Sequence, residues 1–435
     1  MGKGNKDLFS TKKLLSISGL SVFLKTLGAS LSFAFTFLIA RWLGAEQNGI
    51  YMGALSLLMI LSMVARLGLQ NPVLKYVSRE YIDKNTVSMR KIVNTARTWV
   101  ISISILIVLS VSVFLWYYTS IGHKQQSQLY VSLTMLSGVP ILSLNVIVAS
   151  GLIAINRILP SVVISSIMVP ILSLIFYVVI FNDLEAIGVA IAFLLANLLT
   201  LIWSTYIWNK HTKQNGLETL NNFRPKDMWS SAHPLWITKI INNGVLPWGS
   251  VFILSLSDKT FDAGILGVAM RVSLTLGFIL KSVNSILGSR FAYLHKQEKM
   301  DEFKNLAKRA TVILSLLALP LFLVIFCYAD ALMSLAGPEY TTGSTALIII
   351  AIGQLISVMC GPNMMVLAMT GHERELRTAT VITGIIFISL MSFFALGGSV
   401  NDAALTVCIS TIINNILCLY FMKKKLGFTT VPFIK

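Results

Sequence analysis

Long apolar runs, separated by short polar segments, recur along the whole chain. A run of about 18 residues or more with few charges predicts a transmembrane helix. The alternation expected for strands of a membrane barrel is absent. We expect about twelve transmembrane helices, near residues 14–40, 50–69, 99–119, 128–153, 160–181, 187–208, 232–256, 264–289, 310–332, 345–369, 378–397 and 402–421. The sequence therefore predicts an all-α integral membrane protein.

The placement of lysine and arginine predicts the orientation of these spans. An even number of spans puts both termini on one side, and cytoplasmic loops of membrane proteins are rich in basic residues. If that side is the cytoplasm, the inner segments hold 27 of the 35 basic residues and the outer loops hold three. We therefore expect cytoplasmic termini and basic inner loops that contact anionic membrane lipids. This arrangement explains most of the +17 net charge without nucleic acid as a partner.

A shift of 215 residues aligns the first three predicted spans with spans seven to nine. Gly49 then falls on Gly264 and Arg66 on Lys281, while Asn156-Arg157 and Glu373-Arg374 occupy similar inner turns. Both members of each aligned pair of spans enter the membrane from the same side, so the repeat predicts two parallel six-helix lobes around a central cavity. We expect the N-terminal lobe over residues 1–208, a cytoplasmic linker over 209–230 and the C-terminal lobe over 231–435.

Five basic residues fall inside predicted spans: Lys25, Arg66, Lys239, Arg271 and Lys281. A charge near the bilayer centre costs roughly 2.5–3.5 kcal/mol on insertion scales. None of the 18 acidic residues lies at a predicted mid-membrane position. A cationic cavity of this kind favours an anionic ligand, and phosphate or pyrophosphate suits both the arginine fork and the lysine ammonium. We therefore predict these five residues as substrate-binding.

Simpler roles exist for the same residues. Arg66 and Lys281 are near enough to span ends to extend toward the interface. Lys25 lies in a stripe of serine, glycine and alanine, and such small residues also allow close helix packing. Lys239 is followed by Asn242 and by Pro247, which is expected to bend its span.

The sequence gives no sign of a catalytic centre. The inner loops contain no phosphate-binding loop for ATP, and the four cysteines lack the spacing of metal ligands. The predicted outer loops are short, which argues against a membrane-embedded polysaccharide polymerase or ligase. We expect a transporter that is not an enzyme, with no cofactor and no bound metal.

Two segments resemble a known family. The stretch from Ala40 to Tyr51, ARWLGAEQNGIY, followed by Arg66-Leu67-Gly68-Leu69, resembles the first hairpin of Wzx-type O-antigen flippases. These are polysaccharide biosynthesis proteins of the multidrug/oligosaccharidyl-lipid/polysaccharide exporter superfamily. The turn from Thr370 to Arg374 and the segment from Gly337 to Tyr340 also look like family features. Family members often carry an acid at the position of Arg66, so the resemblance gives no role for that residue.

The resemblance implies a function that composition alone does not. Members of this family move an undecaprenyl-diphosphate-linked oligosaccharide, such as a lipopolysaccharide repeat unit, from the inner to the outer leaflet by alternating access. It also implies the bacterial inner (plasma) membrane and, as further partners, other polysaccharide assembly proteins. The alternatives are an ion-coupled multidrug exporter of the same superfamily, which would need buried carboxylates, and a membrane-embedded polymerase or ligase.

Overall fold

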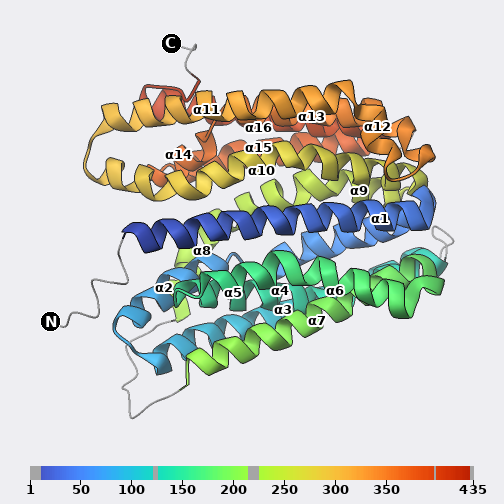
Figure 1. The fold of residues 1–435 in the computed structure, drawn as a ribbon, viewed down its shortest axis with the longest axis horizontal. Helices are drawn as coiled ribbons and strands as arrows, with labels where there is room; N and C mark the ends of the chain where they lie inside the picture. The colour runs from blue at the N-terminus through green and yellow to red at the C-terminus, as the bar shows by residue number, and fades with distance from the viewer. Residues whose placement is uncertain (1–10, 121–125, 214–224, 396–397, 432–435) are drawn as a thin grey trace. The chain divides into compact units, whose positions relative to one another are not determined.

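The chain is helical wherever the structure describes it. The computed structural model describes residues 11–120, 126–213, 225–395 and 398–431 (Figure 1), and these ranges contain helices and turns but no strand. Within them, nine helices are long and apolar enough to cross a membrane. The predicted all-α fold is confirmed, and the chain is a multi-pass membrane protein.

The difference between nine such helices and twelve predicted spans comes from helix continuity. The segments Phe23–Ala65 and Ile158–His211 each cover two predicted spans. The predicted span 232–256 is divided between shorter pieces, because a π-helical turn at Ile241–Val245 separates helix α8 from helix α9. The predicted bend near Pro247 is therefore present, and every predicted span corresponds to helical structure.

The chain divides into two compact units. One combines Met1–Phe35 with Val64–Ala232, and the other combines Thr36–Met63 with His233–Lys435. The second unit thus contains a part of helix α1 that the repeat assigns to the first half of the sequence. The lobe boundaries expected from the sequence stay a prediction.

Helix α4 is the centre of the first unit. It packs against α2, α3 and α7, and buried apolar side chains such as Leu69, Val93 and Leu152 fill the space between them. The helices of this unit after α1 are α2 (Gln70–Ile82), α3 (Thr86–Ser120), α4 (Gln126–Ala154), α5 (Ile158–Val162), α6 (Val169–Phe176) and α7 (Glu185–His211).

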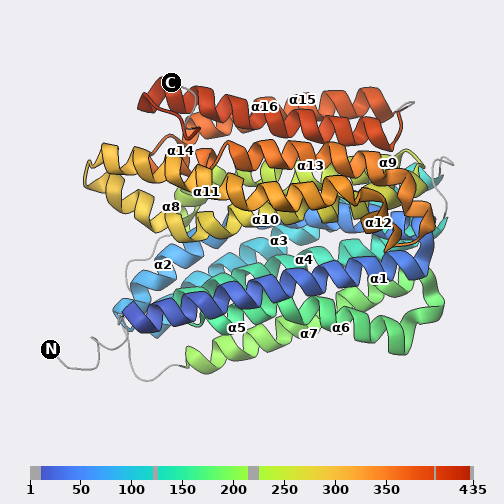
Figure 2. The same ribbon diagram turned by 45° about the horizontal axis from the view of Figure 1, so that its top comes forward.

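Helix α13 has the corresponding place in the second unit. It packs against α10, α11 and α16, and Figure 2 shows α15 beside α16 on the outer side of this unit. The helices here are α8 (Pro225–Ile240, which begins in the first unit), α9 (Leu246–Leu256), α10 (Thr260–Lys296), α11 (Met300–Cys327), α12 (Ala329–Ser334), α13 (Ser344–Met359), α14 (Asn363–Met369), α15 (Glu373–Ala395) and α16 (Val400–Leu426).

Helix α1 (Thr11–Ala65) changes direction at Gly44, whose φ of 73° is a conformation that glycine adopts without strain. The helix ends at Ala65, so the predicted span 50–69 was too long at its inner end. Arg66 lies in the following turn, where Leu67 and Gly68 both have positive φ. The structure therefore corrects the expectation that Arg66 is part of a transmembrane helix.

Both units expose apolar helix faces. In the first unit, Leu106, Leu109 and Val113 of α3 are more than half exposed, and in the second Leu316 and Leu317 of α11 are as well. Exposed apolar surface of this extent would be unfavourable in water and is expected where helices contact lipid.

Candidate functional site

Two helices of the second unit cross at a pair of glycines. An added Cβ on Gly49 of α1 would lie 1.7 Å from the carbonyl oxygen of Thr260, and one on Gly264 of α10 would lie 2.1 Å from that of Ala45. One turn later, Met52 packs on Gly267. Both contacts join residues that are 215 positions apart. Equivalent residues meet in this way at a two-fold axis, so the crossing supports the predicted parallel repeat.

The outer end of this part of α1 is fastened to the segment before α13. The backbone N–H of Ala45 donates to Glu339 Oε1 over 2.6 Å, and the Tyr340 hydroxyl donates to the carbonyl of Ala40 over 3.2 Å. Two segments that carry the family resemblance therefore meet here. Their role in this structure is to hold the turn around Gly44.

Arg271 lies on the same helix, one turn after Gly267. Its guanidinium carbon is 4.8 Å from the ring centroid of Trp248, which is a cation–π contact. Its Nε is buried and has no hydrogen-bond partner among the residues that the structure describes. No carboxylate in that part of the chain forms an ion pair with it. This is the arrangement expected for a cation that binds something absent from the protein itself.

The space beside Arg271 is small. It is a cavity of about 10 Å³, on the scale of one water molecule. Trp248 and Pro247 of α9 and Met52 of α1 line it together with Arg271. Nearby, Tyr51 is 1% exposed, its hydroxyl also has no partner within the described ranges, and it interacts electrostatically with Arg271. The site is closed in this conformation.

A buried polar network lies next to the π-helical turn of the second unit. Asn414 Nδ2 donates to Asn242 Oδ1 over 3.0 Å, and Asn242 Nδ2 donates to the Thr380 hydroxyl over 3.2 Å. The Thr383 hydroxyl is 3.5 Å from Asn414 Oδ1. These bonds connect the turn to α15 and α16, and they stabilise an irregular segment that follows Lys239 closely.

An asparagine pair recurs in both units. In the first, Asn145 Nδ2 donates to the backbone carbonyl of Asn197, and in the second, Asn363 Nδ2 donates to Asn415 Oδ1, each over 3.0 Å. The two pairs are related by a shift of 218 residues, so spans four to six and ten to twelve are repeated as well. Because all four side chains are buried, the pairs are structural contacts.

The predicted binding residues divide between the units. Lys25 and Arg66 belong to the first, and Lys239, Arg271 and Lys281 belong to the second. Lys25 and Lys281 are exposed and form no ion pair with any described residue. Lys239 is partly buried, and none of the other four predicted residues lines the cavity beside Arg271. The structure thus brings Arg271 alone into an enclosed site.

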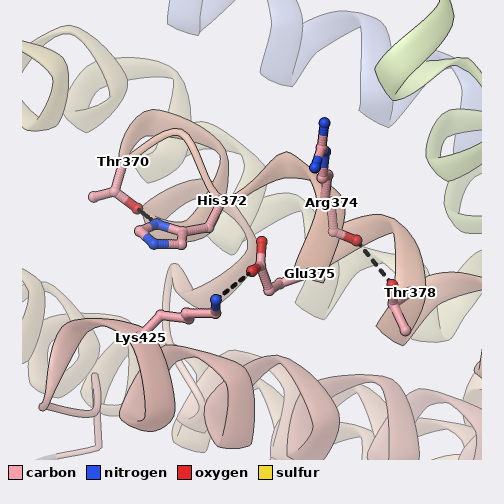
Figure 3. Close-up of polar contacts among 6 residues, drawn as sticks. All are labelled: Thr370, His372, Arg374, Glu375, Thr378 and Lys425. Atoms are coloured by element: carbon pink, nitrogen blue, oxygen red, sulfur yellow. Dashed lines mark hydrogen bonds and ion pairs between the residues drawn. The ribbon is translucent and has the colours of Figure 1, made fainter.

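The turn between Thr370 and Arg374 has a structural role. Figure 3 shows the Thr370 hydroxyl 3.0 Å from His372 Nδ1 and the Glu375–Lys425 ion pair at 3.0 Å, whereas the Arg374 side chain points away from both. Gly371 has a φ of 79°. The backbone bond from His372 to the carbonyl of Leu367 spans five residues.

The equivalent turn of the first unit is built in the same way. Asn156 has a φ of 59°, and Arg157 donates to the carbonyl of Leu152. Asn156 therefore corresponds to Gly371, and Arg157 to His372. Our alignment of Asn156-Arg157 with Glu373-Arg374 was wrong by two residues. A further inner turn corrects the alignment by one, because Lys84 and Glu298, 214 apart, share φ values of 55° and 56°.

Residues 18–290, which are more than half of the chain, match the model of the family described as polysaccharide biosynthesis protein. The chain belongs to this family. No curated protein sequence matches it. The residues that carry the match include the crossing glycines, Tyr51, Trp248 and Arg271.

Solved structures show the fold of this polysaccharide biosynthesis protein. A multidrug resistance MATE family transporter of the MOP superfamily, in an inward-facing conformation, is 12% identical over 92% of this chain and 94% of its own, with a TM-score of 0.74. The lipid II flippase MurJ, inward closed, is 14% identical over 93% and 87%, with a TM-score of 0.72. A MOP superfamily transporter from Pyrococcus furiosus Vc1 is 15% identical over 94% of each chain, with a TM-score of 0.60. The family and fold are those of transporters and flippases.

Sequence reasoning missed the partners of Arg271. Tyr51 and Trp248 lie 220 and 23 residues before it, and both look like ordinary apolar positions in a span. The repeat contained the signal for Tyr51, because the alignment of Gly49 with Gly264 also brings its helix next to Arg271. The asparagine pairs were missed because only one shift was tested, and 218 aligns both members.

Proposed function

We propose that this family member is a flippase for an undecaprenyl-diphosphate-linked oligosaccharide, such as an O-antigen repeat unit. It moves the substrate from the inner to the outer leaflet of the bacterial plasma membrane by alternating access between lobes 1–208 and 231–435. Both termini face the cytoplasm in this proposal. The family supports a saccharide substrate, and the fold, shared with both flippases and multidrug exporters, supports transport.

The state of Arg271 carries the proposal. A buried guanidinium without a carboxylate partner is costly, and mutational experience shows that such charges are kept where they bind or react. Lys281, ten residues further along α10, is a second cation without an ion pair among the described residues. The diphosphate is the part of the substrate that these cations would neutralise, while the polyprenyl chain would stay in lipid.

The distribution of charge outside the spans supports the orientation. Inner segments under this proposal include the basic turns before α3 and α11, where Lys91 and Lys308 lie among other lysines and arginines. Such segments favour the anionic cytoplasmic leaflet. A protease or biotinylation mapping of single-cysteine variants at the two termini would test it, since labelling from outside the cell would reverse the orientation.

Flipping in liposomes tests the function. The purified chain is reconstituted with a fluorescent diphosphate-linked oligosaccharide lipid, and outer-leaflet exposure is measured by quenching. We expect the wild type to flip this lipid and the triple variant Lys25→Ala, Lys239→Ala, Arg271→Ala to be inactive. Lys296→Ala, on the inner end of α10, is the control and should retain activity. Wild-type activity in the triple variant would remove the cationic mechanism, and efflux of cationic drugs without flipping would favour the multidrug exporter.

A further inference from the structure

We propose that Arg271 and Tyr51 together form a two-donor site for one phosphate group, that Trp248 holds the arginine in place, and that helix α1 closes this site in the present conformation. The inference rests on the proposed function, because it names where the diphosphate is gripped. It goes further in assigning roles to Tyr51 and Trp248, which no charge pattern indicated.

The two unpaired donors lie on helices that cross. Arg271 Nε and the Tyr51 hydroxyl are both buried, and neither has a hydrogen-bond partner within the described residues. A buried donor without an acceptor is unfavourable, so a protein seldom keeps two of them side by side. A phosphate oxygen accepts from both. Because Arg271 also brings a charge that no acid offsets, an anion satisfies the pair better than water does.

Trp248 leaves the useful edge of the arginine free. Its ring lies against the face of the guanidinium, with 4.8 Å between the ring centroid and the guanidinium carbon. Guanidinium N–H groups donate in the plane of the group, so stacking on the face and hydrogen bonding at the edge are compatible. Trp248 is therefore a positioning residue, which keeps the Nε edge pointed at the ligand.

Helix α1 explains why the site is empty and closed. The cavity of about 10 Å³ has no room for a phosphate group. Met52 lines it from α1 and packs on Gly267, one turn before Arg271. The ligand therefore enters only when this part of α1 moves away from α10. The bonds from Ala45 to Glu339 and from Tyr340 to Ala40 hold α1 in the closed position.

A purely structural role predicts the opposite sign for stability. If Arg271 and Tyr51 served packing alone, Arg271→Met and Tyr51→Phe would lower the melting temperature or leave binding unchanged. If they are kept for a ligand, both substitutions remove an unsatisfied polar group and the melting temperature does not fall. Binding falls in the same variants. The combination of retained stability and lost binding identifies the site.

The test uses the full-length chain in detergent and radiolabelled inorganic pyrophosphate in equilibrium dialysis, with thermal unfolding measured on the same samples. We expect Arg271→Met and Tyr51→Phe each to weaken binding about tenfold or more, because each removes a hydrogen bond to a charged group. Trp248→Phe keeps an aromatic face and should bind better than Trp248→Leu. Tyr328→Phe and Lys296→Gln are exposed controls that should bind as the wild type does. Glu339→Ala frees α1 and should bind a few-fold more tightly than the wild type.

Three results would overturn the site: wild-type affinity in Tyr51→Phe, wild-type affinity in Arg271→Met, or no saturable binding by either the wild type or Glu339→Ala. The flipping assay separates this inference from the function. Pyrophosphate binding that depends on Arg271 and Tyr51 supports the site even if the wild type flips no lipid-linked oligosaccharide, a result that removes the function alone. Unchanged binding in both variants, with flipping by the wild type, removes the site and leaves the function.

Discussion

Helices α1 and α10 cross at equivalent glycines, yet they differ one turn beyond the next contact. The repeat places Ser56 of α1 opposite Arg271 of α10. The Ser56 hydroxyl donates to the carbonyl of Met52 in its own helix over 2.7 Å, whereas Arg271 Nε has no acceptor among the described residues. The shared glycines serve packing, and the unshared arginine has no packing need that the structure satisfies. A duplicated fold thus separates what holds the helices together from what was added on one side.

The asparagine pairs show the conserved side of the same comparison. Asn145 with Asn197 and Asn363 with Asn415 occupy equivalent places, and each pair makes a buried hydrogen bond. They differ in the acceptor, which is a backbone carbonyl in the first unit and a side-chain oxygen in the second. Shared contacts should therefore be sensitive in stability, and the unshared arginine in transport.

The largest effect is expected at the shared glycines. In Gly49→Ala the added carbon would lie 1.7 Å from a backbone oxygen, so the helices must separate. Overpacking against backbone should cost about 3 kcal/mol or more. Thermal unfolding in detergent measures it, with Gly277→Ala as the control, since that carbon meets only the Gln354 side chain at 3.1 Å. Equal stability of the two variants would contradict the close crossing.

Making the two helices alike at the unshared position should abolish transport while leaving the fold intact. Arg271→Ser gives α10 the residue that α1 has at Ser56. Loss of a charged contact to the diphosphate should lower the flipping rate at least about tenfold, measured in liposomes at matched protein content. Ser56→Ala is the matched control and should flip normally, because its hydroxyl bonds only to its own helix. Normal flipping by Arg271→Ser would show that the difference between the helices is incidental.

The asparagine pairs should respond unequally. Asn415→Ala leaves the buried Asn363 amide without its acceptor, at a cost of about 1–3 kcal/mol. Asn197→Ala keeps the backbone carbonyl that accepts from Asn145, and it also removes an Oδ1 that has no partner in the described ranges. It should cost less than Asn415→Ala in chemical or thermal unfolding. A larger loss for Asn197→Ala would mean that the two pairs are not equivalent.

The smallest effect is expected at an exposed difference between the units. The second unit has an ion pair between Glu375 and Lys425, whose side chains are 20% and 44% exposed. Exposed pairs of this kind contribute little, so Lys425→Met should change the free energy of unfolding by no more than about 0.5 kcal/mol. A loss above 1 kcal/mol in unfolding experiments, at low and high salt alike, would show that this contact is more than a surface pair.

The sequence was sufficient for the spans, the repeat and the selection of Arg271. Long apolar runs determine membrane helices almost by themselves, and an aligned glycine or charge is a position-specific signal. The partners of Arg271 could not be predicted, because Tyr51 and Trp248 are apolar enough to look like lipid-facing or core residues until the crossing places them. Arg66 was misplaced because hydropathy does not detect the turn that Leu67 and Gly68 make with positive φ.

The central claim is that the transported group is negative because the cations facing it lack acidic partners. The most direct measurement compares two lipids in the same wild-type proteoliposomes: the diphosphate-linked oligosaccharide and the same oligosaccharide attached to the polyprenyl chain without phosphate. The account predicts rapid flipping of the first and background rates for the second, with the difference lost in Arg271→Met. Equal flipping of both lipids would contradict it.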